Sequence, residues 1–246
     1  MIDCHRLDLA LSDDHDLLLL DRAERERAQR FKFAIHRGRF IAAHAQARRI
    51  LGASLGIAPA DVPITTTRHG KPIVARAASM AAGVDPERLF CFNLTHCDAV
   101  GYLAIAPFAV GIDVELIRPI ADLQPLIECY CSAAEIDALA RITLEQRAAG
   151  FLGIWTRKEA VLKAWGTGIG AVPLNEVHVG ASADHVPPLQ LTLPTHSQEP
   201  PDRSLDAPLQ ALQNYPALQI RTMANDGQIL SIAAATGQPL EIRMVN

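Results

Sequence analysis

Hydrophobic residues recur along this chain with two periods, one typical of helices and one typical of strands. The clearest helical pattern covers residues 151–166, where large apolar side chains fall on one arc at about 100° per residue. Gly166 follows them and predicts the end of the helix. Weaker patterns predict helices at 12–30, at 36–51, from about 122 and from 132.

Short apolar or alternating runs predict the strands, at 1–10, 62–67, 109–116, 176–180, 189–193, 217–223, 228–235 and 240–245. Residues 90–105 are predicted to be a loop that leads into a buried strand. The turn at Pro107 and Phe108 then makes this strand and 109–116 a hairpin. A second hairpin is predicted around Asn225-Asp-Gly227. The proline-rich segment 194–208 is predicted to be a long exposed loop.

The order of strand, helices and strands occurs twice, with a break near Pro107. This arrangement predicts an α+β protein of two similar halves, 1–107 and 108–246. The composition supports a packed core, since 49% of the 246 residues are hydrophobic and 20% are charged.

The distribution of charge is more informative than its sum. A net charge of −4 argues against a general nucleic-acid binder. Residues 22–49 nevertheless hold nine of the 23 Lys and Arg residues and only two acids, Glu24 and Glu26. This basic segment predicts a local site for an anion.

Cysteine usage and hydropathy predict the compartment. The five cysteines are an odd number and show no metal-ligand spacing. We find no charged-then-apolar leader and no apolar run approaching the roughly 18 residues of a membrane span. The expectation is a soluble cytoplasmic protein with reduced cysteines and no membrane partner.

Candidate chemistry begins with the strand Gly111-Ile-Asp-Val-Glu115, in which Asp113 and Glu115 point to one face. Two adjacent carboxylates indicate either a cation between them or simple solvent exposure. Mg²⁺ typically takes one or two carboxylates together with water and substrate phosphate. Glu159 would add a third carboxylate, and Lys163 could neutralise a phosphate oxygen. The alternative is an exposed salt bridge between Glu159 and Lys163, beside a Lys158 that snorkels from the apolar arc.

Two further segments could bind a substrate. Phe92-Asn-Leu-Thr-His-Cys97 places Thr95 and His96 at a predicted loop-to-strand junction, where functional side chains are common. A histidine bonded only to backbone is the alternative there. The turn Arg68-His-Gly-Lys-Pro72 carries a basic tip that could contact a phosphate.

Taken together, residues 92–96, 111–115 and 155–163 resemble the ordered motifs of the 4′-phosphopantetheinyl transferases, in the longer single-chain class typified by the surfactin-synthetase-activating enzyme. The Gly70-Lys-Pro72 turn and the arginine-rich segment that ends at Arg49 also fit that family. The similarity spans roughly residues 25–175. Cys97 stands where the family often has serine, and Glu24 stands where it has a basic residue.

The resemblance implies transfer of the phosphopantetheine arm of coenzyme A to a serine of an apo acyl or peptidyl carrier protein, with release of 3′,5′-ADP. It also implies a monomer whose two halves are related by a pseudo-twofold axis and meet at the active site. The alternatives are a non-catalytic protein that binds coenzyme A or a carrier, and a metal-dependent hydrolase of nucleotide pyrophosphates.

The same resemblance implies roles for individual residues. Asp113, Glu115 and Glu159 would hold Mg²⁺, or Mn²⁺, on the pyrophosphate, and Glu159 and Lys163 would be catalytic. Glu159 and a metal-bound water are both candidate acceptors for the serine proton. Coenzyme A would be bound by a wider set: Arg27, Arg39, Arg49, Lys71, Thr95, His96 and Lys158.

Overall fold

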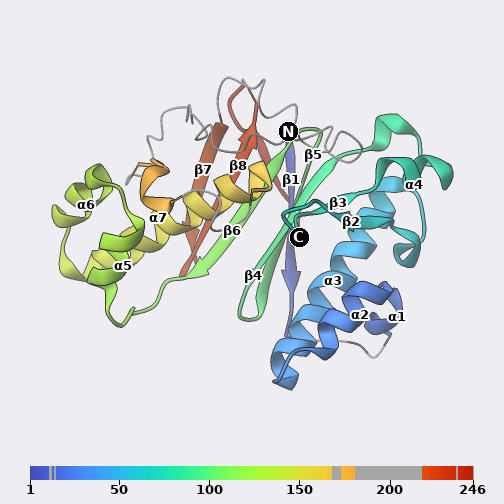
Figure 1. Ribbon diagram of the computed structural model, residues 1–246, viewed down its shortest axis with the longest axis horizontal. Coiled ribbons are helices and arrows are strands. Elements are labelled where there is room, and N and C mark those ends of the chain that lie inside the picture. Colours follow the sequence, from blue (N-terminus) through green and yellow to red (C-terminus); the bar gives the residue numbers. More distant parts are fainter. Residues whose placement is uncertain (11–12, 14, 168–172, 181–217, 237, 246) are drawn as a thin grey trace.

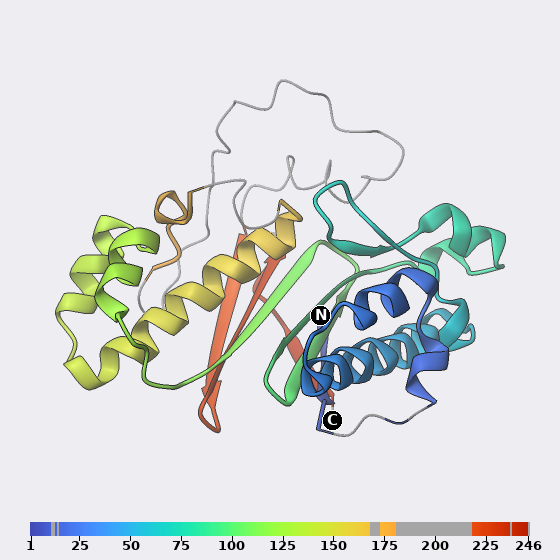
Figure 2. The ribbon, with the colours of Figure 1, turned by 60° about the horizontal axis from the view of Figure 1, so that its bottom comes forward.

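The computed structural model describes residues 1–246 except 11–12, 14, 168–172, 181–217, 237 and 246. Helices and sheets are mixed along the chain, which confirms the α+β class. Figure 1 shows two sheets near the middle of the molecule, with the helices of the two halves of the chain on opposite flanks. Figure 2 shows the same arrangement from below.

The first sheet has four strands in the order β4-β5-β1-β9. Their bounds are Ile2–Asp8 for β1, Cys91–Cys97 for β4, Val100–Ala106 for β5 and Ile242–Val245 for β9. β4 and β5 form an antiparallel hairpin, and β1 pairs antiparallel with β5. The last strand, β9, adds parallel to β1, so the two ends of the chain share one sheet.

The second sheet has three antiparallel strands in the order β6-β8-β7. Their bounds are Val110–Leu116 for β6, Leu218–Asn225 for β7 and Gln228–Ala235 for β8. The predicted hairpin at Asn225-Asp-Gly227 is confirmed. Asp226 and Gly227 both have positive φ, as the favoured two-residue hairpin turn requires.

The helices of the first half lie on one flank of the molecule, and the longest of them packs against the first sheet. They are α1 (Asp16–Leu19), α2 (Arg22–Gln29), α3 (Ala34–Leu55) and α4 (Arg76–Ala81), and a small hairpin is made of β2 (Ile64–Thr66) and β3 (Pro72–Val74). The single helix predicted at 12–30 is wrong. Asp21 accepts a hydrogen bond from the Glu24 N–H and so caps the start of α2, which separates α2 from α1.

The helices of the second half are α5 (Leu123–Tyr130), α6 (Ala133–Ala140) and α7 (Leu144–Trp165). The capping box of Ser132 and Glu135 at the start of α6 is confirmed. Gly166, with φ of 70°, ends α7 as predicted. None of the helices in the described parts of the chain combines the length and hydrophobicity needed to span a membrane.

Three predictions about strands are wrong or untested. The strand paired with 109–116 is not 90–105, because β5 pairs with β4 and β1 whereas β6 pairs with β8. Residues 176–180 form no strand; a short 3₁₀ helix at Leu174–Glu176 runs into irregular backbone. The predicted strand at 189–193 and loop at 194–208 lie outside the described residues.

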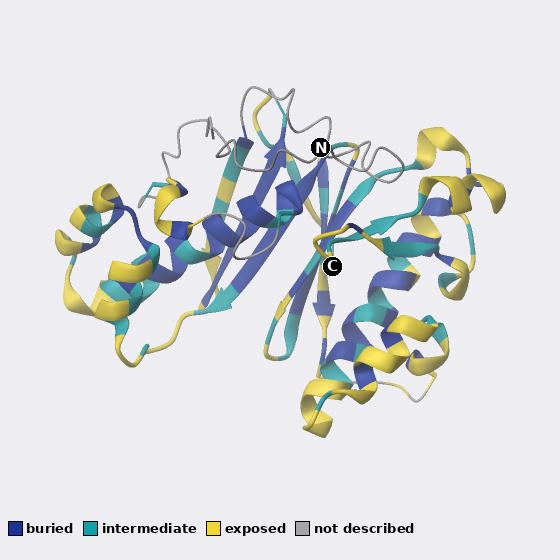
Figure 3. Cartoon of the chain, viewed as in Figure 1, coloured by how far each residue is buried: buried dark blue, intermediate teal, exposed yellow. Residues whose placement is uncertain are grey.

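The hydrophobic core runs through three contacts in series. One cluster joins α3 to the first sheet, a second joins the two sheets, and a third joins the second sheet to α7. Figure 3 shows that α7 is buried along most of its length, whereas α4 and α6 expose much of theirs. In β6, Val110, Ile112 and Val114 belong to the cluster between the sheets, which leaves Asp113 and Glu115 on the other face, as predicted.

Candidate active site

Helix α7 crosses β6 in direct backbone contact at Gly111. A Cβ atom at this position would overlap the carbonyl oxygen of Ala160 and the amide nitrogen of Ala164. Only glycine permits this approach, and it brings Asp113 of β6 against Lys163 of α7. The sequence shows Gly111 as part of a motif, but the need for glycine there becomes clear only when α7 is in place.

Asp113, Lys163 and Thr95 form the centre of the site. The Lys163 Nζ lies 2.6 Å from Asp113 Oδ1 and 3.4 Å from the Thr95 hydroxyl, and Thr95 Oγ1 donates to Asp113 Oδ1 at 3.2 Å. The alternative of an exposed salt bridge between Glu159 and Lys163 is therefore not supported, because Lys163 pairs with Asp113. The predicted loop-to-strand junction is wrong, because Thr95 and His96 lie within β4.

Asn93 is a site residue to which the sequence analysis gave no role. Its side-chain oxygen accepts a hydrogen bond from the backbone N–H of Ile112 at 2.8 Å. This bond fixes β4 to β6, although the two strands belong to different sheets. Asn93 therefore holds Thr95 in register with Asp113, and its position inside the 92–96 motif was the one signal available from the sequence.

The carboxylates of this site are held at a high pKa. Burial raises the pKa of Glu159 to about 7; Asp113 and Glu115 act in the same direction and Lys163 opposes them. Burial also raises the pKa of Asp113, although Lys163 lies beside it. The pKa of Glu115 is raised by burial and by the charge of Asp113. Additional positive charge would therefore favour the ionised form of these acids.

Two carboxylate oxygens in the site have no partner. Asp113 Oδ2 and Glu159 Oε1 are buried and make no hydrogen bond with any described residue. The third acid is better satisfied, since the Cys97 thiol donates to Glu115 Oε2 at 3.5 Å. Buried polar atoms without partners are rare in folded proteins, and a bound ion or water is one way to satisfy them.

These acids alone do not enclose a metal ion. Within the described residues, no three His, Cys, Asp or Glu side chains form a group that could hold one. The chemistry still fits Mg²⁺, which uses one or two protein carboxylates and completes its shell with water and substrate phosphate. The unpartnered oxygens of Asp113 and Glu159 are the ligands that the structure offers.

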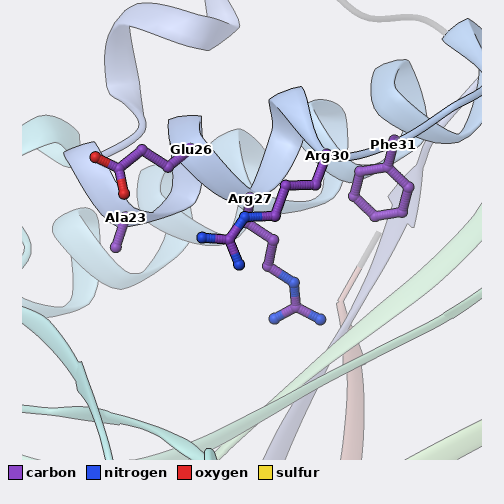
Figure 4. A pocket seen from close by; sticks show the side chains of 5 residues that line it. All are labelled: Ala23, Glu26, Arg27, Arg30 and Phe31. Carbon is purple, nitrogen blue, oxygen red and sulfur yellow. The ribbon is translucent and has the colours of Figure 1, made fainter.

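A basic cleft lies along α2. Figure 4 shows the guanidinium groups of Arg27 and Arg30 directed into it, with Phe31 at one end and Ala23 and Glu26 at the other. Arg27 also stacks on the Phe40 ring, 5.4 Å from its centroid. The sequence gives no sign that Arg30 lines this cleft, because it is one of many cations in the basic segment.

His96 follows Thr95 in β4 and lies among several positive groups. Burial lowers the pKa of His96, and nearby positive groups lower it further. Those groups are His44, Lys163, Arg27 and Arg39. Arg39 is held at 3.1 Å by Asp98, and its buried Nε has no partner among the described residues. The predicted Arg27, Arg39 and His96 therefore lie close enough to interact electrostatically, and their positive groups favour an anion nearby.

The remaining predicted cations are bound by protein groups. Arg49 pairs with Asp16 at 2.6 Å, and Lys71 donates to two backbone carbonyls. The prediction that Lys158 contacts coenzyme A is wrong. Lys158 is fully buried, and its ammonium lies 2.7 Å from Glu135 and 2.8 Å from the carbonyl oxygens of Tyr130 and Leu174.

Glu24 has a structural role that explains its departure from the family pattern. Arg48 is fully buried and donates to Glu24 at 2.6 Å and to Asp21 at 2.7 Å. Glu24 also accepts from His44 at 2.8 Å. A basic residue at position 24 would remove one of the two carboxylates that pair with the buried Arg48 and would add a like charge beside it.

Replacing Lys158 with methionine should destabilise the protein by about 3–5 kcal/mol, because Glu135 would keep a buried charge without its partner. Adding Glu135→Gln should recover part of this loss. An amide removes the charge, but its single oxygen can accept from only one of the two backbone N–H groups, of Ser132 and Val179, that bind different oxygens of Glu135. Urea unfolding of the single and double variants measures both effects. Equal stability of the two variants would contradict the role of the pair.

Comparison with known proteins adds independent information. The sequence model of the 4′-phosphopantetheinyl transferase superfamily matches residues 109–216. The 4′-phosphopantetheinyl transferase HetI of Nostoc sp. is 35% identical over 168 residues, which are 68% of this chain and 67% of HetI. A phosphopantetheinyl transferase of Thraustochytrium sp. is 34% identical over 61% of this chain and 54% of its own length. The 4′-phosphopantetheinyl transferase psf-1 of Bacillus pumilus is 34% identical over 59% of this chain and 58% of its own length.

Proposed function

Because the chain belongs to the 4′-phosphopantetheinyl transferase superfamily, we propose that it transfers 4′-phosphopantetheine from coenzyme A to a serine of an apo acyl or peptidyl carrier protein, with release of 3′,5′-ADP. The observation that carries the proposal is the pair of unpartnered oxygens on Asp113 and Glu159 beside Lys163. A protein that only bound coenzyme A would gain nothing from burying these acids. The aligned regions span two thirds of HetI and between half and two thirds of the other two relatives.

The reaction is attack of a serine hydroxyl on the phosphorus next to pantetheine, with 3′,5′-ADP as the leaving group. Such transfers depend on positioning and charge neutralisation more than on covalent help from the protein. Asp113, Glu115 and Glu159 would hold the metal. Mg²⁺, when bound, neutralises charge on the pyrophosphate and orients it.

The remaining steps belong to side chains of the chain itself. Lys163 is partly exposed and directed at Asp113, so its ammonium can also donate to a phosphate oxygen of the leaving group. Glu159, whose pKa burial raises to about 7 in the metal-free protein, is one candidate acceptor for the serine proton, and a metal-bound water is the other. Arg27, Arg30 and His96 would bind the nucleotide end of coenzyme A.

The positions of these residues also bear on the two halves of the chain, its oligomeric state and its location. We propose an N-terminal half, 1–107, that carries the basic cleft and a C-terminal half, 108–246, that carries the metal ligands. Since both parts of the site lie on one chain, the protein would act as a monomer. All five cysteines are free, which fits the proposed cytoplasmic location.

Intact-mass spectrometry tests the function. Apo carrier proteins from fatty-acid, polyketide and peptide synthesis are incubated with the protein, coenzyme A and Mg²⁺. A mass gain of one phosphopantetheine group on any carrier supports the proposal and identifies the partner class. Release of free phosphopantetheine without a carrier would instead show a hydrolase. No product with any carrier would contradict a transferase.

Mg²⁺ should raise the melting temperature more at pH 8 than at pH 5.5. Because the pKa of Glu159 is raised from 4.5 to about 7 by burial, the metal-free folded state retains protons across this window that the unfolded state releases. Stability from this group is therefore lost as the pH rises, and a bound cation offsets the loss. Mg²⁺ at 100 times its Kd would stabilise by about 2.7 kcal/mol, or roughly 5–10 °C here.

Differential scanning fluorimetry with and without Mg²⁺ measures this shift. The matched controls are Asp113→Asn, which should lose the shift, and Asp3→Asn in the surface ion pair with Arg243, which should keep it. A shift of equal size at both pH values would show that these acids do not bind the ion.

A further inference from the structure

Lys71 joins the two halves of the protein at the active site. It lies in the turn between β2 and β3, and its Nζ donates to the carbonyl oxygens of Val110 at 3.0 Å and Ala164 at 3.2 Å. Figures 1 and 2 both show this hairpin reaching from the α3 side toward the end of α7. Val110 is the first residue of β6, and Ala164 directly follows Lys163 in α7.

The two acceptors explain why a cation is placed there. Ala164 lies in the last turn of α7, where carbonyl groups lack partners within the helix. A positive charge at this end also interacts favourably with the helix dipole. Through these two bonds, one ammonium holds the end of α7 to the start of β6, close to the contact at Gly111.

We propose that Lys71 is a positioning residue for the transfer reaction, fixing the end of α7 against β6 so that Lys163 stays aligned with Asp113. This inference rests on the proposed function. It also departs from the expected contact of Lys71 with coenzyme A, since its ammonium already donates to the protein backbone.

The surroundings of Lys71 make the role dependent on pH. In the described part of the chain no carboxylate pairs with it, and the titratable group that acts on it is Cys91 of β4. Burial lowers the pKa of Lys71 from 10.5 to about 8, with Cys91 opposing the shift. Burial raises the pKa of the Cys91 thiol, so it stays neutral in this range. Above pH 8 the amine loses its charge, and its two hydrogen bonds weaken.

Deprotonation of Lys71 at high pH is expected to lower activity but to raise the stability of the fold. The unfolded chain keeps the Lys71 proton up to pH 10.5, whereas the folded protein loses it near pH 8. Between these values the unfolded state binds more protons, so this group makes the fold more stable as the pH rises. A loss of turnover above pH 8 without a loss of stability would therefore be specific to alignment.

The variants Lys71→Met and Lys71→Arg test the proposal, with Arg141→Met on the exposed surface as the matched control. We expect Lys71→Met to lower kcat by about 10- to 100-fold, as for a small misalignment of reacting groups. The KM for coenzyme A should change little. Lys71→Arg keeps its charge at all pH values, so it should retain most of kcat and extend it to higher pH. Arg141→Met should match the wild type.

Each outcome has a defined meaning. A raised KM with unchanged kcat would show a contact with coenzyme A and overturn the proposal, as would wild-type kinetics for Lys71→Met. If Lys71→Met does not fold, the pH dependence of kcat in the wild type and in Lys71→Arg decides. A fall in wild-type kcat near pH 8 that moves to higher pH in Lys71→Arg supports the proposal. A fall at the same pH in both proteins overturns it. Absence of transfer by the wild type would instead contradict the proposed function.

Discussion

Replacing Asp113 with asparagine should remove most of the transfer activity and leave the protein at least as stable as the wild type. Turnover should fall by about 10²- to 10³-fold, the range for loss of one preorganised electrostatic contact. Stability should not fall, because burial raises the pKa of Asp113 and its ionised form therefore destabilises the fold at neutral pH. Lys163, left without this partner, is exposed enough to be solvated.

Steady-state kinetics and thermal unfolding of the same preparation measure the two effects. Asp3→Asn is the matched control, since it removes a carboxylate from a surface ion pair with Arg243 and should change neither quantity much. Near-normal turnover in Asp113→Asn would place Asp113 outside the reaction. A parallel loss of turnover and of folded protein would show that its role is structural.

The parts of the fold that the sequence predicted correctly are marked by local signals. The end of α7 needs a residue with positive φ, and Gly166 supplies it. The hairpin of β7 and β8 needs positive φ at two adjacent residues, which Asp226 and Gly227 adopt. Both features depend on a few neighbouring residues, so they can be recognised without knowing the rest of the fold.

The pairing of strands could not be predicted in the same way. β9 joins β1 across nearly the whole chain, and no local pattern records that contact. The strand predicted at 176–180 shows a related error. Val177 and Val179 alternate with polar residues and are buried, but the Val179 N–H donates to Glu135 at 2.9 Å and not to a neighbouring strand.

In the candidate site, too, local motifs could be predicted from the sequence, whereas long-range contacts could not. Its acids could be identified because Asp113, Glu115 and Glu159 belong to motifs with fixed spacing. Their partners could not be identified, because Lys163 pairs with Asp113, 50 residues away in the sequence, and not with Glu159, its neighbour on the helix. Lys158 was misassigned because the sequence gives no sign that Glu135, recognisable as a helix cap, also pairs with it.

Of the substitutions that add a single methyl group in the site, Gly111→Ala should reduce stability and activity the most. Its Cβ would overlap the backbone of α7 at Ala160 and Ala164, and a helix backbone cannot rotate away as a side chain can. Overpacking in a core commonly costs about 1–3 kcal/mol, and we expect at least the upper value here. Because α7 must shift relative to β6, Lys163 would also leave its place beside Asp113. We therefore expect kcat to fall by about 10²-fold in the protein that still folds.

Gly153→Ala is the matched control, because Gly153 is also buried but lies within α7 itself. Its Cβ would meet nothing nearer than Arg157 Nη1 at 3.6 Å, an ordinary contact. Alanine is favoured over glycine inside a helix by about 1 kcal/mol, so this variant should be as stable as the wild type or more so. Urea unfolding and kcat of the two variants distinguish the positions. Similar results for both would mean that α7 does not rest on Gly111, and the alignment of Lys163 with Asp113 would need another cause.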